Sequence, residues 1–116
     1  MPIRIKRIYE AAGRTDGRRI LVDRLWPRGL SKERAAIDFW AKDVSPSNEL
    51  RRWYGHTAEK WPAFKRRYFA ELDANSEGVA QLRHAMGRGT ATLLFGSTEM
   101  RLNNAVALKE YLESRR

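Results

Sequence analysis

The sequence predicts an α/β domain with a short, mostly parallel sheet flanked by helices. Two observations carry this prediction. Residues 20–23 and 91–95 form short, continuous apolar runs, which are typical of strands buried in a parallel sheet. Segments with helical spacing of apolar residues lie between these runs, and parallel neighbouring strands need such crossover connections. The 116 residues suit one domain, so we expect a single α/β domain over residues 1–116.

The N-terminal third predicts short elements separated by turns. Glycine, serine and polar clusters mark the boundaries between them. The expected elements are a strand at residues 3–9, a loop at 10–17, a strand at 20–23, a short helix at 31–34 capped by Ser31, and a small strand or extended segment at 37–40.

The remainder of the chain is mostly helical by pattern. Each predicted helix has a local start or stop signal of the kind that caps helices. The expected helices are one from Ser45-Pro46 to Tyr54 that ends at Gly55, one from about Lys60 with Pro62 in its first turn, one carrying Val79, Leu82 and Met86 that ends at Gly87, and a last one capped by Asn103.

The direction in which the first two strands pair stays open at this stage. A crossover through the helical middle would make the strand at 91–95 a parallel neighbour of an earlier strand. The strands at 3–9 and 20–23 are separated only by a loop, so they could also pair antiparallel.

The charge balance favours anionic partners. The chain has 23 Lys and Arg residues against 14 Asp and Glu residues, which gives a net charge of +9. Such an excess suits phosphates, nucleotides, nucleic acid or acidic proteins. The basic residues are spread along the chain, whereas a single basic tail or helix would be a stronger signal for nucleic acid.

Several classes of protein are excluded by what the sequence lacks. It contains no cysteine, which excludes disulfides, a thiol nucleophile and thiolate metal sites. It has none of the short motifs of P-loop, dinucleotide-binding or zincin proteins, and its two histidines have no ligand spacing, so we expect neither cofactor nor metal. It has no apolar run of membrane-spanning length, and we expect no signal peptide. We therefore expect a cytoplasmic protein with no membrane partner.

The candidate site lies where two predicted strands end. Ligands of open α/β sheets bind beyond the carboxyl ends of the strands. Here those ends are followed by residues 23–29 and 96–104, and the second segment leads into a helix N-terminus that favours an anion. If the two strands are parallel neighbours, both loops open onto one cleft. The ligand-binding residues predicted from these loops are Arg24, Trp26, Arg28, Gly29, Asn103 and Asn104.

Three residues of these loops are candidates for catalysis, namely Asp23, Ser97 and Glu99. Glu99 is the best general acid or base if burial raises its pKa. Ser97 is a weak nucleophile because no His or Asp can be assigned as its base from the sequence.

Each residue of the candidate site also has a structural interpretation. Asp23 could only cap a turn or pair with an arginine, and Trp26 could fill the core with its indole N–H satisfied at the edge. Asn103 and Asn104 suit helix caps. The alternatives for Arg24 and Arg28 are structural ion pairs with Asp38, Asp43 or Glu49.

Four blocks of the sequence resemble the YeaO-like proteins within the family of domain of unknown function number 488. The blocks are RILVDRLWPRGLSKE, FWAKDVSPSNELRRWYGH, WPAFKRRYFAEL and TLLFGSTEMRLNNAVALKEYL. The resemblance implies that Asp23, Pro27 and Glu99 carry over from the wider family's D-x-R-x-x-P and C-x-E motifs, with the arginine of the first motif displaced by one position to Arg24. The family's cysteines are absent here, which excludes a cysteine-dependent mechanism. The second block adds Lys42 and Ser47 as residues bordering the cleft, with a solvated lysine and a helix cap as their alternatives.

Three functions are compatible with the sequence. The favoured one is an uncharacterised α/β protein that binds a phosphate or nucleotide-like anion in the cleft, with hydrolase or transferase chemistry open. The alternatives are nucleic-acid binding through the basic surface and a protein-interaction module without catalysis. The sequence leaves the ligand, the oligomeric state and the presence of any enzymatic activity undetermined.

Overall fold

The predicted strands form one parallel sheet in the computed structural model, which describes residues 2–115. Within that part of the chain, the strands are β1 (Ile3–Arg7), β2 (Arg18–Leu21), β3 (Phe39–Trp40) and β4 (Ala91–Phe95). Their order across the sheet is β1-β4-β2-β3, and each neighbouring pair is parallel. The predicted α/β fold with a short parallel sheet is therefore confirmed.

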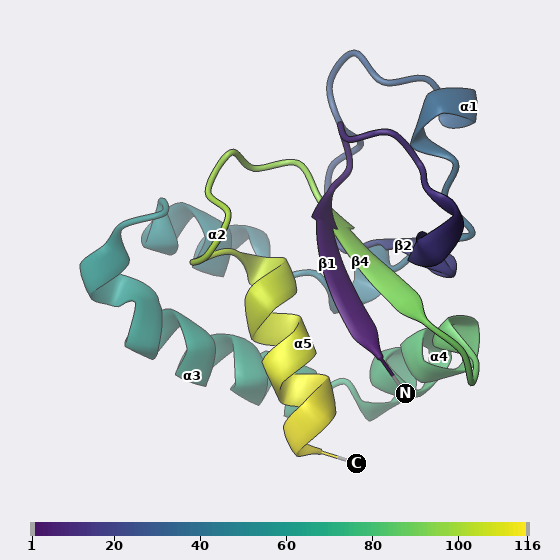
Figure 1. Cartoon of the computed structure of the whole chain (residues 1–116). Helices are drawn as coiled ribbons and strands as arrows, with labels where there is room; N and C mark the ends of the chain where they lie inside the picture. Colours follow the sequence, from purple (N-terminus) through teal and green to yellow (C-terminus); the bar gives the residue numbers. More distant parts are fainter. Residues whose placement is uncertain (1, 116) are drawn as a thin grey trace.

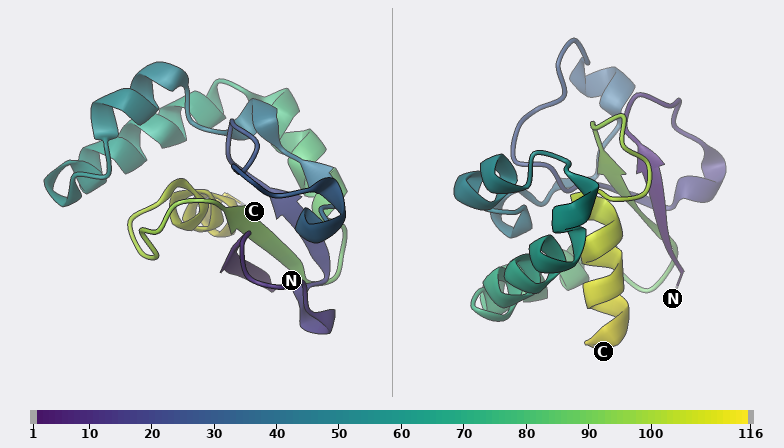
Figure 2. Two further views of the ribbon diagram at one scale, coloured as in Figure 1. Left: turned by 90° about the horizontal axis from the view of Figure 1, so that it is seen from above. Right: turned by 90° about the vertical axis from the view of Figure 1, so that its left-hand side faces the viewer.

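Most of the helical mass covers one face of this sheet. In the left panel of Figure 2, the chain from α2 to α4 runs in an arc around α5 and the sheet. The helices of the described part are α1 (Lys32–Ala35), α2 (Asn48–Tyr54), α3 (Trp61–Asp73), α4 (Ser76–Met86) and α5 (Asn104–Ser114), with 3-10 turns at Arg14–Asp16, Lys42–Val44 and Ala58–Lys60.

The last strand of the chain lies in the interior of the sheet. β4 pairs with β1 on one side and with β2 on the other, so that Leu93 is level with both Ile5 and Ile20. The first two strands therefore run parallel without pairing with each other. Because β2 and β4 are parallel neighbours, the loops that follow them leave the sheet at the same end, at the top of Figure 1.

The main core fills the space between the sheet and the helices α2 to α5. Alternate residues of β4 and its neighbours point into it, including Leu93 and Phe95, which are fully buried. Aromatic side chains of α3 pack here as well. Phe64 stacks on Tyr54 of α2 with ring centroids 4.3 Å apart, so these rings attach α2 to α3.

The opposite face of the sheet is apolar over one half only. Leu21 and Leu94 point to this side, where they pack with Ala35 of α1. Trp26 and Trp40 close this second core, with their rings edge to face and their centroids 5.5 Å apart.

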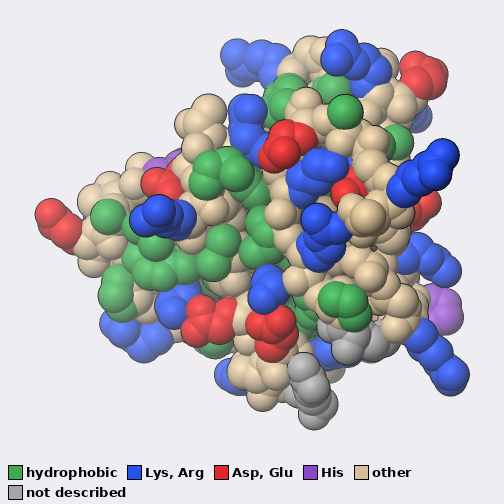
Figure 3. Space-filling model, in the orientation of Figure 1, with side chains coloured by type: hydrophobic (Ala, Val, Ile, Leu, Met, Phe, Trp, Pro, Cys, Tyr) green, Lys and Arg blue, Asp and Glu red, His purple; other side chains and the backbone are tan. Residues whose placement is uncertain are grey.

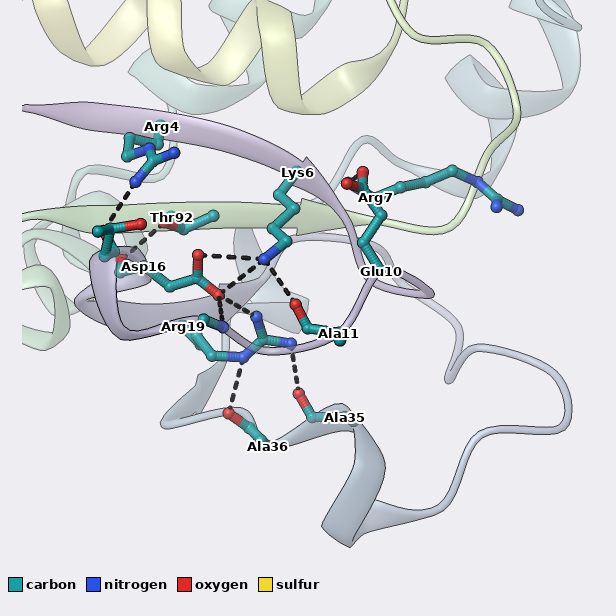
Figure 4. A network of polar contacts seen from close by, with 12 residues as sticks. Arg4, Lys6, Arg7, Glu10, Ala11, Asp16, Arg19, Ala35, Ala36 and Thr92 are labelled. Carbon is teal, nitrogen blue, oxygen red and sulfur yellow. Dashed lines mark hydrogen bonds and ion pairs between the residues drawn. The ribbon is translucent and has the colours of Figure 1, made fainter.

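The other half of that face carries a buried cluster of charges, shown in Figure 4. The Asp16 carboxylate accepts hydrogen bonds from Arg19, from Lys6 at 3.2 Å and from the Gly13 N–H at 3.0 Å. The Arg19 guanidinium also donates to the carbonyls of Ala35 and Ala36. Only 2% of Asp16 and 4% of Arg19 are exposed, so this ion pair joins the turn before β2 to the end of α1 inside the protein.

Some element boundaries differ from the predictions. The strand expected at 20–23 begins and ends earlier, and the one expected at 3–9 ends at Arg7, where Glu10 N–H donates to the Arg7 carbonyl and turns the chain. The helix expected to begin at Ser45-Pro46 begins at Asn48. Ser47 is its cap, because its hydroxyl accepts from the Leu50 N–H at 3.1 Å while Ser45 stays extended.

The predictions for the other helices are confirmed at their ends. Ser31 and Asn103 cap α1 and α5, and Gly87 ends α4. Pro62 lies in the first turn of α3, where it removes no helical hydrogen bond. Gly55 ends α2 in a left-handed conformation.

Candidate functional site

A cleft of about 360 Å³ opens at the carboxyl ends of β2 and β4. The loops after these strands form one wall, and α2 with the start of α3 forms the other. The lining residues are Asp23, Arg24, Leu25, Pro46, Arg51, Arg52, Tyr54, His56, Phe64, Ser97 and Asn104. The prediction that both strand-end loops border one cavity is therefore correct in its geometry.

Asp23 connects the two loops at the base of the cleft. Its Oδ2 accepts a hydrogen bond from the Gly96 N–H at 2.8 Å, and its Oδ1 accepts one from the Asn104 side-chain amide at 3.0 Å. Burial raises the pKa of Asp23, although these hydrogen bonds and the positive charges of Arg51 and His56 act to lower it. Asp23 thus holds a costly negative charge in a largely positive cleft.

The two asparagines at the start of α5 have different roles. Asn103 is fully buried and caps the helix, since its side-chain oxygen accepts from the Val106 N–H at 3.0 Å and its amide donates to the Glu99 carbonyl at 2.8 Å. Asn104 lines the cleft, and its amide also donates to the Val22 carbonyl at 3.0 Å. The cap interpretation therefore applies to Asn103, while Asn104 fixes the Asp23 carboxylate.

Asn103→Ala is expected to destabilise the protein by about 1 to 2 kcal/mol, because the cap and the tether to Glu99 are both lost inside the core. Urea denaturation followed by circular dichroism would measure the change. Asn48→Ala is the matched control, since Asn48 is exposed and follows the cap of α2 instead of forming it. An equal loss in both variants would contradict the role given to Asn103.

Arg24 is positioned in the cleft by backbone carbonyls. Its guanidinium donates to Pro46 O at 3.3 Å and to Ser45 O at 3.4 Å. A guanidinium has five N–H donors, so most of them are left for other partners. The alternative of a structural ion pair with Asp38, Asp43 or Glu49 is not found for Arg24, which has no carboxylate within 4 Å in residues 2–115.

Four lining residues come from α2 and the turn after it, and the sequence analysis did not assign them to the site. The Tyr54 hydroxyl donates to the Leu102 carbonyl at 2.6 Å, which holds α2 against the loop after β4. Burial, with the nearby Glu99 charge, raises the pKa of Tyr54 and keeps this donor protonated. The other residues of this group are Arg51, Arg52 and His56. The Arg51-Arg52 pair near the end of a predicted helix was the signal that could have located them.

Ser97 and Glu99 belong to one turn of the loop after β4. The Ser97 hydroxyl accepts from the Glu99 N–H at 2.9 Å, and Glu99 accepts from the N–H groups of Arg101 and Leu102 at 2.9 and 3.1 Å. These backbone hydrogen bonds lower the pKa of Glu99. The raised pKa on which its predicted acid or base role depended is therefore not found, because the carboxylate stabilises its own turn.

Six residues predicted to bind the ligand lie outside the lining of the cleft, and one of them is the buried helix cap Asn103. Trp26 belongs to the second core, where its indole N–H donates to the Leu30 carbonyl at 2.7 Å. Ser47 caps α2 and donates to Glu71 at 2.6 Å. The other three, Arg28, Gly29 and Lys42, are exposed. The Lys42 ammonium lies 5.1 Å from the centre of the Trp40 ring, on a surface away from the cleft lining.

The described residues contain no cluster of three or more His, Asp or Glu side chains that could hold a metal ion. Within residues 2–115, every helix is too short or too polar to span a membrane. The cleft therefore has to be interpreted from its arginines, its single carboxylate and its apolar walls.

Comparison with known proteins places the chain beside uncharacterised relatives. A protein-family model described as "Inactive DUF488-N3 subclade" matches residues 2–116. The uncharacterized protein Rv3073c of Mycobacterium tuberculosis is 39% identical over 113 residues, covering 97% of this chain and 95% of that protein. The uncharacterized protein YeaO of Escherichia coli is 38% identical over 114 residues, covering 98% and 99%. No solved structure matches the chain.

Proposed function

The chain belongs to the DUF488 family, and on that premise we propose that it binds a small organic anion in the cleft between β2, β4 and α2 without converting it chemically. The names of the matched relatives do not say what the cleft binds. The proposal therefore depends on the residues of the cleft.

One observation carries the proposal, namely the excess of unneutralised positive charge in the cleft. Three arginines and a histidine line it together with a single carboxylate. Among the described residues, none of these arginines has a carboxylate oxygen within 4 Å. Within residues 2–115, the Arg51 guanidinium donates only to the Asn48 side chain, at 2.9 Å. Guanidinium groups held without an acidic partner suit bidentate binding of phosphate or carboxylate.

The walls of the cleft favour an anion that also has an apolar part. Pro46 and the rings of Tyr54 and Phe64 supply the inner wall. Leu25 also lines the cleft, and 64% of its surface is exposed, so it offers a further apolar contact that a ligand could cover. Ligand sites commonly combine such apolar walls with a few polar groups. An aryl or alkyl phosphate is therefore the class of ligand that fits best.

Two observations support binding without turnover. The only hydroxyl nucleophile predicted for the site, Ser97, contacts a backbone N–H and has no basic side chain as partner in residues 2–115. The description of the matched family as inactive agrees with this. Incubation of the protein with 4-nitrophenyl phosphate should release no 4-nitrophenol above the rate of a buffer blank. Release that depends on protein concentration would contradict this part of the proposal.

The binding itself can be tested by substitution in α2. Arg51→Met should raise the dissociation constant of 4-ethylphenyl phosphate about tenfold, because a charge-assisted hydrogen bond is lost while the apolar stem is kept. Isothermal titration calorimetry at 50 mM and 300 mM salt would measure it.

Arg28→Met is the matched control, because Arg28 is an exposed arginine outside the cleft lining. It should bind the probe like the wild type. Equal losses in both variants would mean that the phosphate associates with the basic surface in general. Binding of short oligonucleotides that falls steeply with salt would instead favour the nucleic-acid alternative. Figure 3 shows the Lys and Arg side chains spread over the visible face, which agrees less well with that alternative.

A further inference from the structure

Asp23 is the exception to the positive character of the cleft. It lines the same cavity as Arg24, Arg51 and Arg52, yet no Lys, Arg or His nitrogen lies within 4 Å of its carboxylate in the described chain. Its two oxygens accept from neutral donors instead, one each, at 2.8 and 3.0 Å. The cleft therefore presents separate positive and negative groups to a ligand.

The Asp23 carboxylate has capacity for further donors. An ionised carboxylate offers about four lone-pair sites, and only two hydrogen bonds to protein groups are present among the described residues. Gly96 leaves space beside the carboxylate, because a Cβ at that position would lie 3.3 Å from the Asp23 Oδ2 and would crowd it. The same burial that raises the pKa of Asp23 makes its charge costly, and a cationic donor beside it would offset that cost.

The contacts of Asp23 distinguish it from the buried carboxylate on the other face of the sheet. Asp16 is compensated by Arg19 and Lys6 within the protein, and so needs no external partner. Within residues 2–115, Asp23 accepts hydrogen bonds only from neutral donors, and it lines a cavity. A purely structural carboxylate would be expected to resemble Asp16.

We propose that the ligand of the cleft is bifunctional, with an anionic group held by the arginines and an ammonium or similar N–H donor held by the Asp23 carboxylate. This inference rests on the proposed function and specifies its ligand class. Asp23 is then the residue that selects amine-bearing anions over anions of equal size without an amine.

Two matched pairs of probes test the selection, each pair differing only in its amine. The first pair is 2-aminoethyl phosphate and ethyl phosphate, and the second is tyramine phosphate and 4-ethylphenyl phosphate. The two amine-bearing probes differ in the distance between their phosphate and their amine. The experiment therefore also shows which of the two distances the cleft accepts. Calorimetry on the wild-type protein should give about tenfold tighter binding or more for the amine member of at least one pair.

Asp23→Asn and Asp23→Ser should abolish this preference, leaving the two members of the pair within about twofold of each other. In Asp23→Asn, the new amide nitrogen faces either the Gly96 N–H or the Asn104 amide, both of which are donors. Asp23→Ser is therefore the second variant, because a hydroxyl can both donate and accept. The readout is the ratio of two dissociation constants in one protein sample. Any unfolded fraction weakens both probes equally, and so it cancels.

The outcomes separate the two proposals. Equal binding within both pairs in the wild type, or a preference that survives in both variants, overturns the bifunctional ligand. If the bifunctional ligand is overturned but Arg51→Met still weakens the binding of 4-ethylphenyl phosphate, the proposed anion site remains supported. If none of the four probes binds, the anion site and the inference built on it both fail.

Discussion

Asp16→Asn is expected to lower the free energy of unfolding by about 3 to 5 kcal/mol. The substitution leaves Arg19 buried without its charge partner while changing the shape of the side chain little. Removing one member of a buried ion pair is costly because the remaining charge is shielded from water and no longer has its counter-charge. Guanidinium denaturation at neutral pH would measure the loss. Asp43→Asn, at an exposed aspartate, should change the stability by less than about 0.5 kcal/mol.

The same ion pair predicts how the effect depends on pH. Although burial acts to raise the pKa of Asp16, hydrogen bonds from Gly13, Arg19 and Lys6 hold it below the ordinary value of 3.8. A lowered folded-state pKa means that the stabilisation is fully present above the unfolded-state value and is lost as the pH falls through the folded-state value. The gap between wild type and Asp16→Asn should therefore be constant near neutral pH and close below about pH 4. A gap that does not close in acid would show that lost packing, not charge, causes the effect.

Gly17→Ala is expected to cost about 3 kcal/mol and to lower the melting temperature by roughly 10 °C. Gly17 has a φ of +64°, in the left-handed region, and a Cβ there would lie 2.0 Å from the Thr90 carbonyl oxygen. That oxygen accepts the Arg18 N–H at 3.0 Å, where β2 begins to pair with β4. The added methyl group would therefore displace the start of this pairing. Differential scanning calorimetry would measure both quantities.

Two other glycines separate the causes of this effect. Gly29 has a φ of +77° with nothing within 4 Å of an added Cβ, so Gly29→Ala tests the backbone strain alone. Gly89 also has open space and no positive φ, so Gly89→Ala should leave the melting temperature nearly unchanged. The loss should be largest at Gly17, smaller at Gly29 and smallest at Gly89. If Gly17→Ala were no worse than Gly29→Ala, Thr90 would have to yield at little cost.

The elements that the sequence predicts best have signals contained in their own residues. The apolar run at Ala91–Phe95 is a strand over its full predicted length. Asn103 and Gly87 bound their helices because capping depends on hydrogen bonds within a few residues. The start of α2 could not be chosen in this way, since both Ser45 and Ser47 are good caps. Tertiary contacts favour Ser47, whose N–H and hydroxyl both donate to Glu71 of α3.

The candidate site was predictable where it follows from strand order. Asp23 and Asn104 were assigned to one cleft because parallel neighbours end at the same edge of a sheet. The direction of Trp26 was not predictable, because it depends on the second core, which needs that ring to cover Trp40. That Arg51 lines the cleft was not predictable from the sequence either, because it depends on how α2 packs over the loop after β4.

The position of β4 in the sheet has a consequence for the order in which the chain folds. β4 comprises residues 91–95 of 116, yet it is the strand that joins β1 to β2. During synthesis from the N-terminus, β1 has no strand to pair with until four-fifths of the chain exists, and β2 can pair only with the two residues of β3. The sheet therefore closes late, after α3 and α4 have been made, and the apolar residues of β1 and β2 depend until then on the helices or on chaperones for cover.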